Sequence, residues 1–383
     1  MRRLTCLFLA SFVLAASASA QIGKRISINA GTPEDRAVQE ITAATDPAQK
    51  LALLDQFLAA HSQDDMALVA YDMYLEHYLQ AQNYEKAYEY GEKALAIDPD
   101  GYNILNRMFH AAQQQADAAR LMDYGLRIGE ILQRFKARPA PEGMEENVWK
   151  ASKSTTLGDN QDSINYVAYT VFNTAYQNPD PAAKAAQLEK FVAAFPDSPY
   201  TGNAQTVVAH TYQQMGQPEK LDAFGEKMLA TDPNNFAMLI LLADNWSERG
   251  AELDKAEAYA NKALQTLQTA EKPAALTDEQ WAQQKPVQQG LAHSAIGQVQ
   301  LHRKQYADAV TTLTQAAPLL KSETLPYSRN QLRLGYAYAS LRQTVEARAA
   351  LTQAAEADTP YRARAQEIMN SLTTTQPARR RRP

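Results

Sequence analysis

The chain has 383 residues, of which 45% are hydrophobic and 21% are charged, and this composition is typical of a folded protein rather than a disordered one. Its fifteen glycines amount to about 4% of the residues, against roughly 7% in proteins generally. Long alternating runs of valine and isoleucine are missing from the sequence. The composition therefore predicts an all-α protein and argues against a β-sandwich, a β-barrel and a Rossmann fold.

The first 20 residues have the features of a cleaved export signal. Two arginines precede an apolar run over residues 4–16, which is shorter than the roughly 20 residues of a membrane-spanning helix. Residues 18–20 read Ala-Ser-Ala and match the small-x-small site at which signal peptidase cleaves. We therefore expect a mature, exported chain that begins at Gln21, with the periplasm as its compartment and secretion or attachment to the envelope as alternatives. An uncleaved N-terminal membrane anchor is the competing interpretation.

The predicted cleavage removes Cys6, which is the only cysteine of the chain. A mature chain without a thiol forms no disulfide, no cysteine-ligated metal site and no thiolate nucleophile. Cleavage also removes two arginines, so the net charge falls from −5 to −7, and the body without the four arginines at 379–382 carries −11. An acidic body of this kind disfavours nucleic acid as a partner.

An internal duplication organises the sequence. Residues 46–99 align without a gap onto residues 180–233, at an offset of 134, with 21 identities in 54 positions. A second match, at an offset of 132, aligns Trp149 with Trp281. The duplicated unit of about 134 residues is close to four helix-turn-helix repeats of 34 residues each.

Individual residues follow a known 34-residue pattern, W-x2-L-G-x2-Y, then A-x3-F, then P. In the first copy the corresponding positions are Tyr71, Tyr74, Leu75, Tyr78, Ala87, Gly91 and Pro99. Near the end they are Gln331, Leu334, Gly335, Tyr338, Ala347 and Leu351, with Pro360 one residue late. Over most of residues 33–372 the chain thus resembles the tetratricopeptide repeat (TPR) proteins, of the exported bacterial type.

The resemblance implies a fold and a general role. The expected fold is an all-α, TPR-type solenoid, a right-handed superhelix of helix-turn-helix repeats in which the first helix of each repeat lines a concave groove. Small residues such as Ala87 and Gly335 let paired helices approach closely, and large ones such as Tyr78 and Leu351 fill the spaces between repeats. The implied role is a non-catalytic scaffold that binds protein or peptide partners in the groove.

Breaks in the pattern divide the chain. Two prolines and a glycine interrupt residues 137–145, a milder break lies at 271–277, and a tryptophan-bearing helix follows each. The predicted segments are a signal peptide at 1–20, a lead-in at 21–32, repeats at 33–136, a connecting helix at 137–164, repeats at 165–270, a connecting tryptophan helix at 271–289, repeats at 290–372 and a disordered basic tail at 373–383.

No motif predicts catalysis. The sequence contains no HExxH, GxGxxG, P-loop or GxSxG motif, so we expect no enzyme activity, no cofactor and no metal site. The six histidines are far apart in the sequence and are interpreted as surface or packing residues: His61, His77, His110, His210, His293 and His302. Two alternatives remain open. One is an enzyme or enzyme subunit with a site at a break near Trp149 or Trp281, and the other is a self-assembling array.

Two stripes of side chains are candidate binding surfaces. On a helix predicted near residues 162–177, one stripe consists of Tyr166, Tyr169, Asn173 and Tyr176, roughly opposite Val171 and Phe172. Exposed tyrosines would suit a groove that binds a peptide, and a helix buried on both sides is the alternative. Only one of the two stripes can be core.

The second candidate stripe lies in the last clear repeat and consists of Arg329, Leu332, Arg333 and Tyr336. The two arginines are one helical turn apart and are expected to grip a carboxylate of a partner, whereas solvated arginines are the alternative. At the C-terminus, Arg379, Arg380, Arg381 and Arg382 are candidates for a peripheral contact with phosphate-bearing lipids, and a solubilising tail is the alternative. The sequence therefore predicts a TPR scaffold of the bacterial envelope that acts in envelope assembly or secretion, and does not name the partner.

Overall fold

The computed structural model describes residues 20–272 and 276–374. Within these ranges every regular element is an α-helix, 18 in number, and no strand is present, so the predicted all-α class is confirmed. The predicted export signal, apart from Ala20, and the arginines at 379–382 lie outside the described residues. The contacts divide the chain into two compact units, residues 1–208 and residues 209–383.

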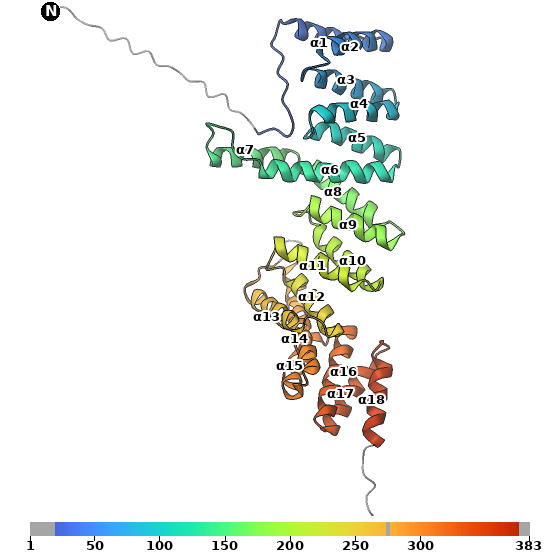
Figure 1. Ribbon diagram of the computed structural model, residues 1–383, viewed down its shortest axis with the longest axis vertical. Helices are drawn as coiled ribbons and strands as arrows, with labels where there is room; N and C mark the ends of the chain where they lie inside the picture. The colour runs from blue at the N-terminus through green and yellow to red at the C-terminus, as the bar shows by residue number, and fades with distance from the viewer. Residues whose placement is uncertain (1–19, 273–275, 375–383) are drawn as a thin grey trace, which may run out of the picture. The chain divides into compact units, whose positions relative to one another are not determined.

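Unit 1 consists of four consecutive helix pairs, α1–α2, α3–α4, α5–α6 and α8–α9, and of the additional helices α7 and α10 (Figure 1). The two helices of a pair pack on each other, and each pair also packs on the next one along the chain. The helices are α1 (Pro33–Ala43), α2 (Pro47–His61), α3 (Ala67–Gln80), α4 (Tyr84–Ile97), α5 (Tyr102–Gln114), α6 (Ala118–Ala137), α7 (Glu146–Asp159), α8 (Gln161–Tyr176), α9 (Pro181–Ala194) and α10 (Thr201–Gln214), in which the boundary between the units falls.

Unit 2 also consists mainly of helix pairs. The pairs α12–α13, α14–α15 and α16–α17 pack in succession, and the last helix, α18, packs on both helices of the final pair. The helices are α11 (Pro218–Thr231), α12 (Phe236–Arg249), α13 (Leu253–Thr269), α14 (Asp278–His302), α15 (Tyr306–Leu320), α16 (Thr324–Ser340), α17 (Thr344–Glu356) and α18 (Arg362–Thr374).

Five turns between paired helices have the same geometry. In each turn one residue has a positive φ of 52–62°, and the next residue donates its backbone N–H to the carbonyl oxygen five positions earlier, at 2.8–2.9 Å, as in a Schellman motif. The residues of positive φ are Gln82, Ala116, Gly216, Lys304 and Arg342. Four of them have a side chain that disfavours this conformation by about 1–2 kcal/mol, so helix packing must hold these turns in shape.

The helices follow the offset found in the sequence. Shifted by 134 residues, the bounds of α2, α3, α4 and α5 coincide with those of α9, α10, α11 and α12 to within one residue. The same offset relates two close contacts between helices. Gly91 lies against Met108, and Gly225 lies against Leu242.

Helices of a pair approach closely where one of them lacks a large side chain. A Cβ atom placed on Gly335 would lie 2.6 Å from Cγ of Leu351, and the predicted crossing residues Ala87 and Ala347 are completely buried. The large residues predicted to fill the spaces are also buried, with 8% of Tyr78 exposed. Gly335 therefore lies at a close helix contact, as predicted, whereas Leu351 packs on it within the same pair and does not fill a space between repeats.

The two tryptophan-bearing segments differ in the structure. In unit 1 the segment is broken at Asn160 into α7 and α8, whereas in unit 2 the single helix α14 runs unbroken through Pro286. The predicted boundary between residues 289 and 290 therefore lies inside one helix. In both units a lysine lies over the tryptophan ring. Lys153 Nζ is 5.9 Å from the centre of the Trp149 ring, and Lys285 Nζ is 5.8 Å from the centre of the Trp281 ring.

The first described residues pack on unit 1, although the sequence predicted only a lead-in there. The backbone N–H of Ala20 donates to Oγ of Ser152 at 2.7 Å, and Thr156 donates to the carbonyl oxygen of Ala20 at 2.5 Å. Further along, the backbone N–H of Lys24 donates to Asp98 at 2.9 Å. These contacts hold the segment against α7 and against the turn between α4 and α5.

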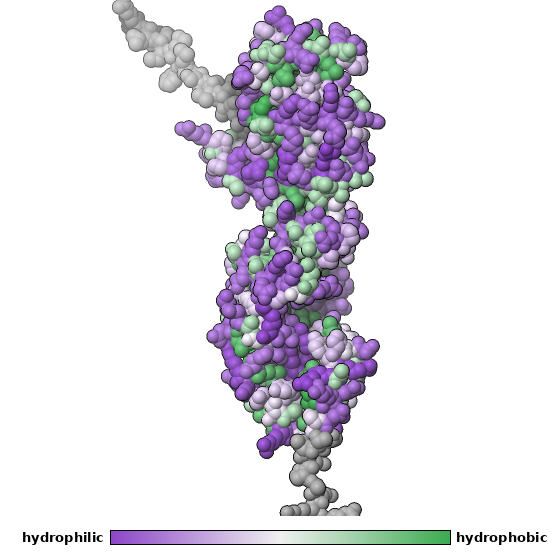
Figure 2. Space-filling model, turned by 45° about the vertical axis from the view of Figure 1, so that its right-hand side comes forward, coloured by the Kyte–Doolittle hydropathy of each residue, from purple (hydrophilic) through white to green (hydrophobic). Residues whose placement is uncertain are grey.

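Hydrophilic residues cover most of the face seen in Figure 2, with small hydrophobic areas between them. Such scattered apolar surface is normal for folded proteins. Among the described residues, no helix combines the length and the apolar character that crossing a membrane requires.

Replacing the equivalent glycines by alanine tests the packing at the crossings. We expect Gly225→Ala to lower the free energy of unfolding by about 1–3 kcal/mol, because the new Cβ would lie 2.6 Å from Leu242 Cδ2 and 2.7 Å from its branched Cγ. Gly91→Ala is the matched control, since unbranched Met108 can move aside and the gain in helix propensity is the same. Urea denaturation of both variants measures the difference, and equal stability would contradict this account of the contact.

Candidate partner-binding site

A cavity of about 300 Å³ lies on one face of unit 2. Its walls come from the first helices of three consecutive pairs, α12, α14 and α16, and from α18 with the residue that precedes it. These helices pack beside one another in that order, and we call the surface they form the first-helix face. The cavity is lined by Glu248, Gln298, Leu301, His302, Arg329, Leu332, Arg333, Tyr336, Tyr361, Arg364 and Ile368.

All four residues of the second predicted stripe line this cavity. Arg329, Leu332, Arg333 and Tyr336 lie on successive turns of α16, where spacings of three and four residues place side chains on one side of a helix. Leu332 is half-buried, and 43% of Tyr336 is exposed. The sequence was therefore sufficient to group these residues on one surface.

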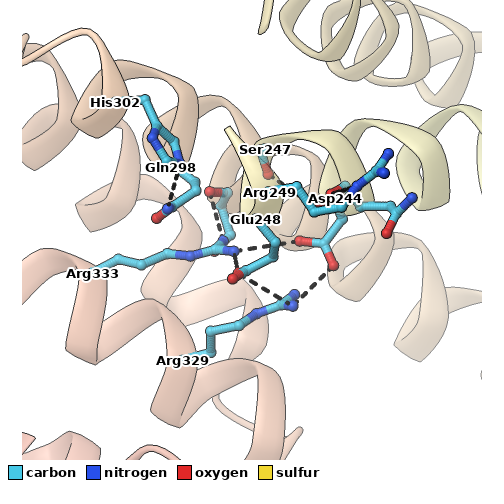
Figure 3. A network of polar contacts seen from close by, with 10 residues as sticks. Asp244, Ser247, Glu248, Arg249, Gln298, His302, Arg329 and Arg333 are labelled. Carbon is cyan, nitrogen blue, oxygen red and sulfur yellow. Dashed lines mark hydrogen bonds and ion pairs between the residues drawn. The ribbon is translucent and has the colours of Figure 1, made fainter. Parts of the chain in front are cut away.

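Arg333 links three helices from a buried position, with only 5% of the residue exposed. Its Nη1 donates to the carbonyl oxygen and to Oγ of Ser294 in α14, at 2.9 and 2.8 Å. Its Nη2 donates to Glu248 of α12 (Figure 3). Burial and the charge of neighbouring Arg329 lower the pKa of Arg333, yet a guanidinium group stays protonated in proteins, so a permanent positive charge is fixed here.

Arg329 is held by the same helix, α12. Its Nη1 donates to Oδ2 of Asp244 at 2.9 Å and lies 3.7 Å from Oε1 of Glu248. Burial opposes the charge of Arg329, but the two carboxylates raise its pKa on balance. The two arginines were expected to bind a carboxylate of a partner. They are instead paired within the chain, with Asp244 and Glu248, each of which lies 85 residues before its arginine. The two arginines and the two carboxylates together carry no net charge, and we call this side of the cavity its wall.

Much of the remaining lining of the cavity is apolar and aromatic. Leu301, Leu332 and Ile368 supply aliphatic surface, and the rings of Tyr336 and Tyr361 stand beside them. Small-molecule sites are typically apolar hollows of this size with a few fixed polar groups, and aromatic or aliphatic anchors in such hollows dominate protein interfaces. The arrangement can therefore accept one large apolar or aromatic side chain above a neutral, hydrogen-bonded wall.

The tyrosines of the first predicted stripe are exposed on unit 1. The exposed fractions of Tyr166, Tyr169 and Tyr176 are 41%, 47% and 47%. Asn173 is half-buried, and Val171 on the other side of α8 is completely buried. The alternative of a helix buried on both sides is therefore not what the structure shows.

Other aromatic rings extend this stripe. The ring of Tyr169 lies 5.5 Å from that of Tyr200, which is itself stacked on Phe172 at 5.4 Å. On a neighbouring helix, His110 stacks on Tyr166 at 5.8 Å. This surface belongs to unit 1, and the cavity belongs to unit 2.

The described residues contain no cluster of candidate metal ligands. Within residues 20–272 and 276–374, no group of three or more His, Cys, Asp or Glu side chains is placed to hold a metal ion. Burial raises the pKa of Tyr88 to about 12, and it also raises the pKa of Tyr74 and Tyr124. These tyrosines belong to the packed core of unit 1, where such shifts are structural.

The residues at the predicted breaks have packing roles. Trp149 donates its Nε1–H to the carbonyl oxygen of Arg138 at 3.0 Å, and Lys153 donates to the carbonyl oxygens of Lys136 and Arg138 at 2.7 and 2.8 Å. They therefore bind carbonyl groups at the C-terminal end of α6, which a helix leaves unpaired.

Comparisons with known proteins yield solved structures only. No protein-family model and no curated protein matches the chain. Similar solved structures include the TPR protein TTC0263 of Thermus thermophilus (19% identity, 54% of this chain and 99% of that chain covered, TM-score 0.35). They also include yeast Tom70 (12%, 89% and 95%, TM-score 0.29) and the TPR domain of P58(IPK) (12%, 90% and 100%, TM-score 0.27).

The fold of this chain is a TPR-type array of helix pairs. The assignment follows from its own geometry, because the paired helices, the repeated left-handed turns and the small residues at the crossings all recur along the chain. A shared fold of this kind does not define an activity.

Sequence analysis missed the carboxylates that hold the two arginines. Asp244 and Glu248 are four residues apart on α12, and nothing in their own segment distinguishes them from solvated acids. A matched spacing is the only signal, since each lies 85 residues before its arginine. The contribution of α18 to the cavity was also missed, because a terminal helix has no repeat partner to indicate it.

Replacing Arg333 by methionine tests the buried network. We expect Arg333→Met to lower the free energy of unfolding by about 3 kcal/mol, because the carboxylates of α12 lose a buried partner and Ser294 loses its donor. Arg364→Met is the matched control in the same cavity, and it should cost less than about 1 kcal/mol, since that side chain is 58% exposed and its ion pair in the described part of the chain is with exposed Glu367. Chemical denaturation of both variants decides the matter, and similar losses would refute the special role of Arg333.

Proposed function

We propose that this chain is a non-catalytic scaffold of the bacterial cell envelope, which binds a segment of a partner protein on the first-helix face of unit 2. The observation that carries the proposal is the cavity of about 300 Å³ between α12, α14, α16 and α18. Its aliphatic and aromatic lining is open to a partner's side chain, whereas its charged wall is already paired.

The fixed wall favours binding because little has to be ordered when a partner arrives. Arg333 and Arg329 are held in place by carboxylates and by Ser294 before any partner is present. Rigid sites of this kind avoid the loss of side-chain entropy that weakens association. Because the charges of the wall cancel, an apolar or aromatic side chain of the partner is the group to be recognised, and a carboxylate is not.

The tyrosine stripe of α8 is a second proposed contact surface. Tyrosine combines a large apolar ring with a polar end, and it is enriched in interfaces for that reason. Tyr166, Tyr169 and Tyr176 are each more than 40% exposed. A partner could therefore engage both surfaces, or two partners one surface each.

The envelope location rests on the sequence. The arginines and apolar run of residues 2–16, the Ala-Ser-Ala at 18–20 and the lack of cysteine after Cys6 fit an exported protein of an oxidising compartment. Roles in envelope assembly or secretion are consistent with a protein-binding scaffold in that place.

A photo-crosslinking amino acid tests the site in cells. Placed at Tyr336, it should yield one crosslinked partner segment, identified by mass spectrometry, whereas the same group at Val345 of α17, which is 78% exposed, should not. A synthetic peptide of the crosslinked segment should then bind Tyr336→Ala and Leu332→Ala variants about 1–3 kcal/mol more weakly than the native chain. Val345→Ala should leave that affinity unchanged. Crosslinks of equal yield at both positions would count against the cavity.

N-terminal sequencing tests the export proposal. Protein recovered from the envelope fraction should begin at Gln21, because cleavage is expected after the Ala-Ser-Ala of residues 18–20. We expect the new N-terminus to remain docked on unit 1, since Arg138 donates to the carbonyl oxygen of Gln21 at 3.0 Å and Ile22 is buried. Recovery of the chain with Met1 intact in the membrane fraction would contradict cleavage.

A further inference from the structure

The first helix pair of the array encloses a groove that nothing in the described chain fills. A cavity of about 360 Å³ lies between α1 and α2. Pro33, Ala37 and Ile41 of α1 face Leu53, Phe57 and Ala60 of α2 across it, and in each helix these residues are spaced by three or four positions along one side. The groove therefore has an apolar floor.

The rim of this groove is acidic. Glu34 and Glu40 of α1 line it, and neither has an ion-pair partner among the described residues. A hydrogen bond from its own backbone N–H, and after it one from the hydroxyl of Thr32, lower the pKa of Glu34, so this carboxylate is ionised at neutral pH. Arg36 and Lys50, the only arginine or lysine residues of the pair, do not line the groove.

The helix pair α1–α2 as a whole is acidic, as is the rim of the groove. Residues 33–66 contain seven acidic and two basic side chains, with histidine counted as neutral, and their net charge is −5. His61 lies at one end of the groove and forms a hydrogen bond with Asp64 at 3.1 Å. A basic segment with some apolar character would fit this groove.

The opposite end of the sequence has that chemistry. The nine residues 375–383, which follow the last described residue of α18, contain no lysine and no acidic residue. Their four arginines are consecutive at 379–382, and their net charge is +4. Nine residues reach about 30 Å when extended, which is sufficient to cross a groove between two helices.

We propose that the groove between α1 and α2 of one copy of this chain binds residues 375–383 of a second copy. The aliphatic stems of the arginines would cover the apolar floor, and their guanidinium groups would pair with the carboxylates of Glu34 and Glu40. Pro377 and Pro383 each disfavour helical backbone at the residue that precedes them. Because the two contacting surfaces differ, the interface is heterologous, and each added copy offers a free groove and a free tail. The chain therefore assembles head to tail.

A peptide measures the contact directly. Fluorescence anisotropy would follow a labelled peptide of residues 373–383 binding to the full chain in which residues 379–382 are glutamines, so that no tail of the chain competes. We expect Glu34→Gln with Glu40→Gln to weaken binding about tenfold, as the loss of two rim ion pairs implies. Glu346→Gln with Asp308→Gln removes two exposed acids of α17 and α15 and should leave the affinity unchanged. Equal weakening by both pairs, or no binding of the peptide, would overturn the proposal.

Charge exchange in the full chain tests the assembly. Sedimentation velocity should show species that grow with protein concentration at about 20 mM salt and dissociate at about 300 mM salt, where charges are screened. Glu34→Arg with Glu40→Arg should abolish the growth, and so should Arg379→Glu, Arg380→Glu, Arg381→Glu and Arg382→Glu made together. The two changes made together in one chain should restore it, because the complementarity is restored with the signs reversed.

The remaining outcomes also decide the proposal. A native chain that stays monomeric at every concentration while its groove still binds the peptide would indicate a tail bound to its own groove and would overturn assembly between copies. Growth that neither charge change alters would place the self-association elsewhere. Neither result bears on the cavity of unit 2, whose partner is tested separately at Tyr336.

Discussion

The close approach of consecutive helices, within a pair and between neighbouring pairs, is the constraint on which the rest of this structure depends. Where Gly225, Gly297 and Gly335 stand, the next helix places a leucine within 2.5–2.6 Å of the position that a Cβ would take. A larger residue would push the helices apart and change the angle at which the following pair stacks. Because each pair rests on its neighbour, errors of this kind would be carried along the array and would change the spacing of helices that form the binding surfaces.

The turns between helices depend on the same close packing. A residue of positive φ followed by a hydrogen bond to the carbonyl five positions earlier ends the first helix and starts the second in five turns. Most of these positions have a side chain rather than glycine, so each turn is strained locally and stable only in its packed context. The strained turns therefore depend on the packing of the helices that they connect.

Unit 2 adds a buried polar network to this general plan. Arg333 connects α12, α14 and α16 through Glu248 and Ser294, at a place where apolar packing would also have held three helices together. Buried ion pairs of this type contribute little net stability compared with apolar residues, but they fix side chains in direction. The outcome is a cavity whose wall is rigid and neutral, beside which aliphatic and aromatic groups remain available to a partner.

The sequence by itself determined the helical class, the repeat length, the offset of 134 residues and the grouping of Arg329, Leu332, Arg333 and Tyr336 on one side of a helix. These features follow from local spacing, because a helix repeats every 3.6 residues and a repeat protein copies its packing pattern. Only the tertiary structure decided what surrounds those residues. Asp244 and Glu248 lie 85 residues earlier in the chain, and their proximity depends on how three helix pairs stack, which no local pattern encodes. For the same reason the tyrosines of α8 could be grouped from the sequence, while their exposure became apparent only once the neighbouring helices were in place.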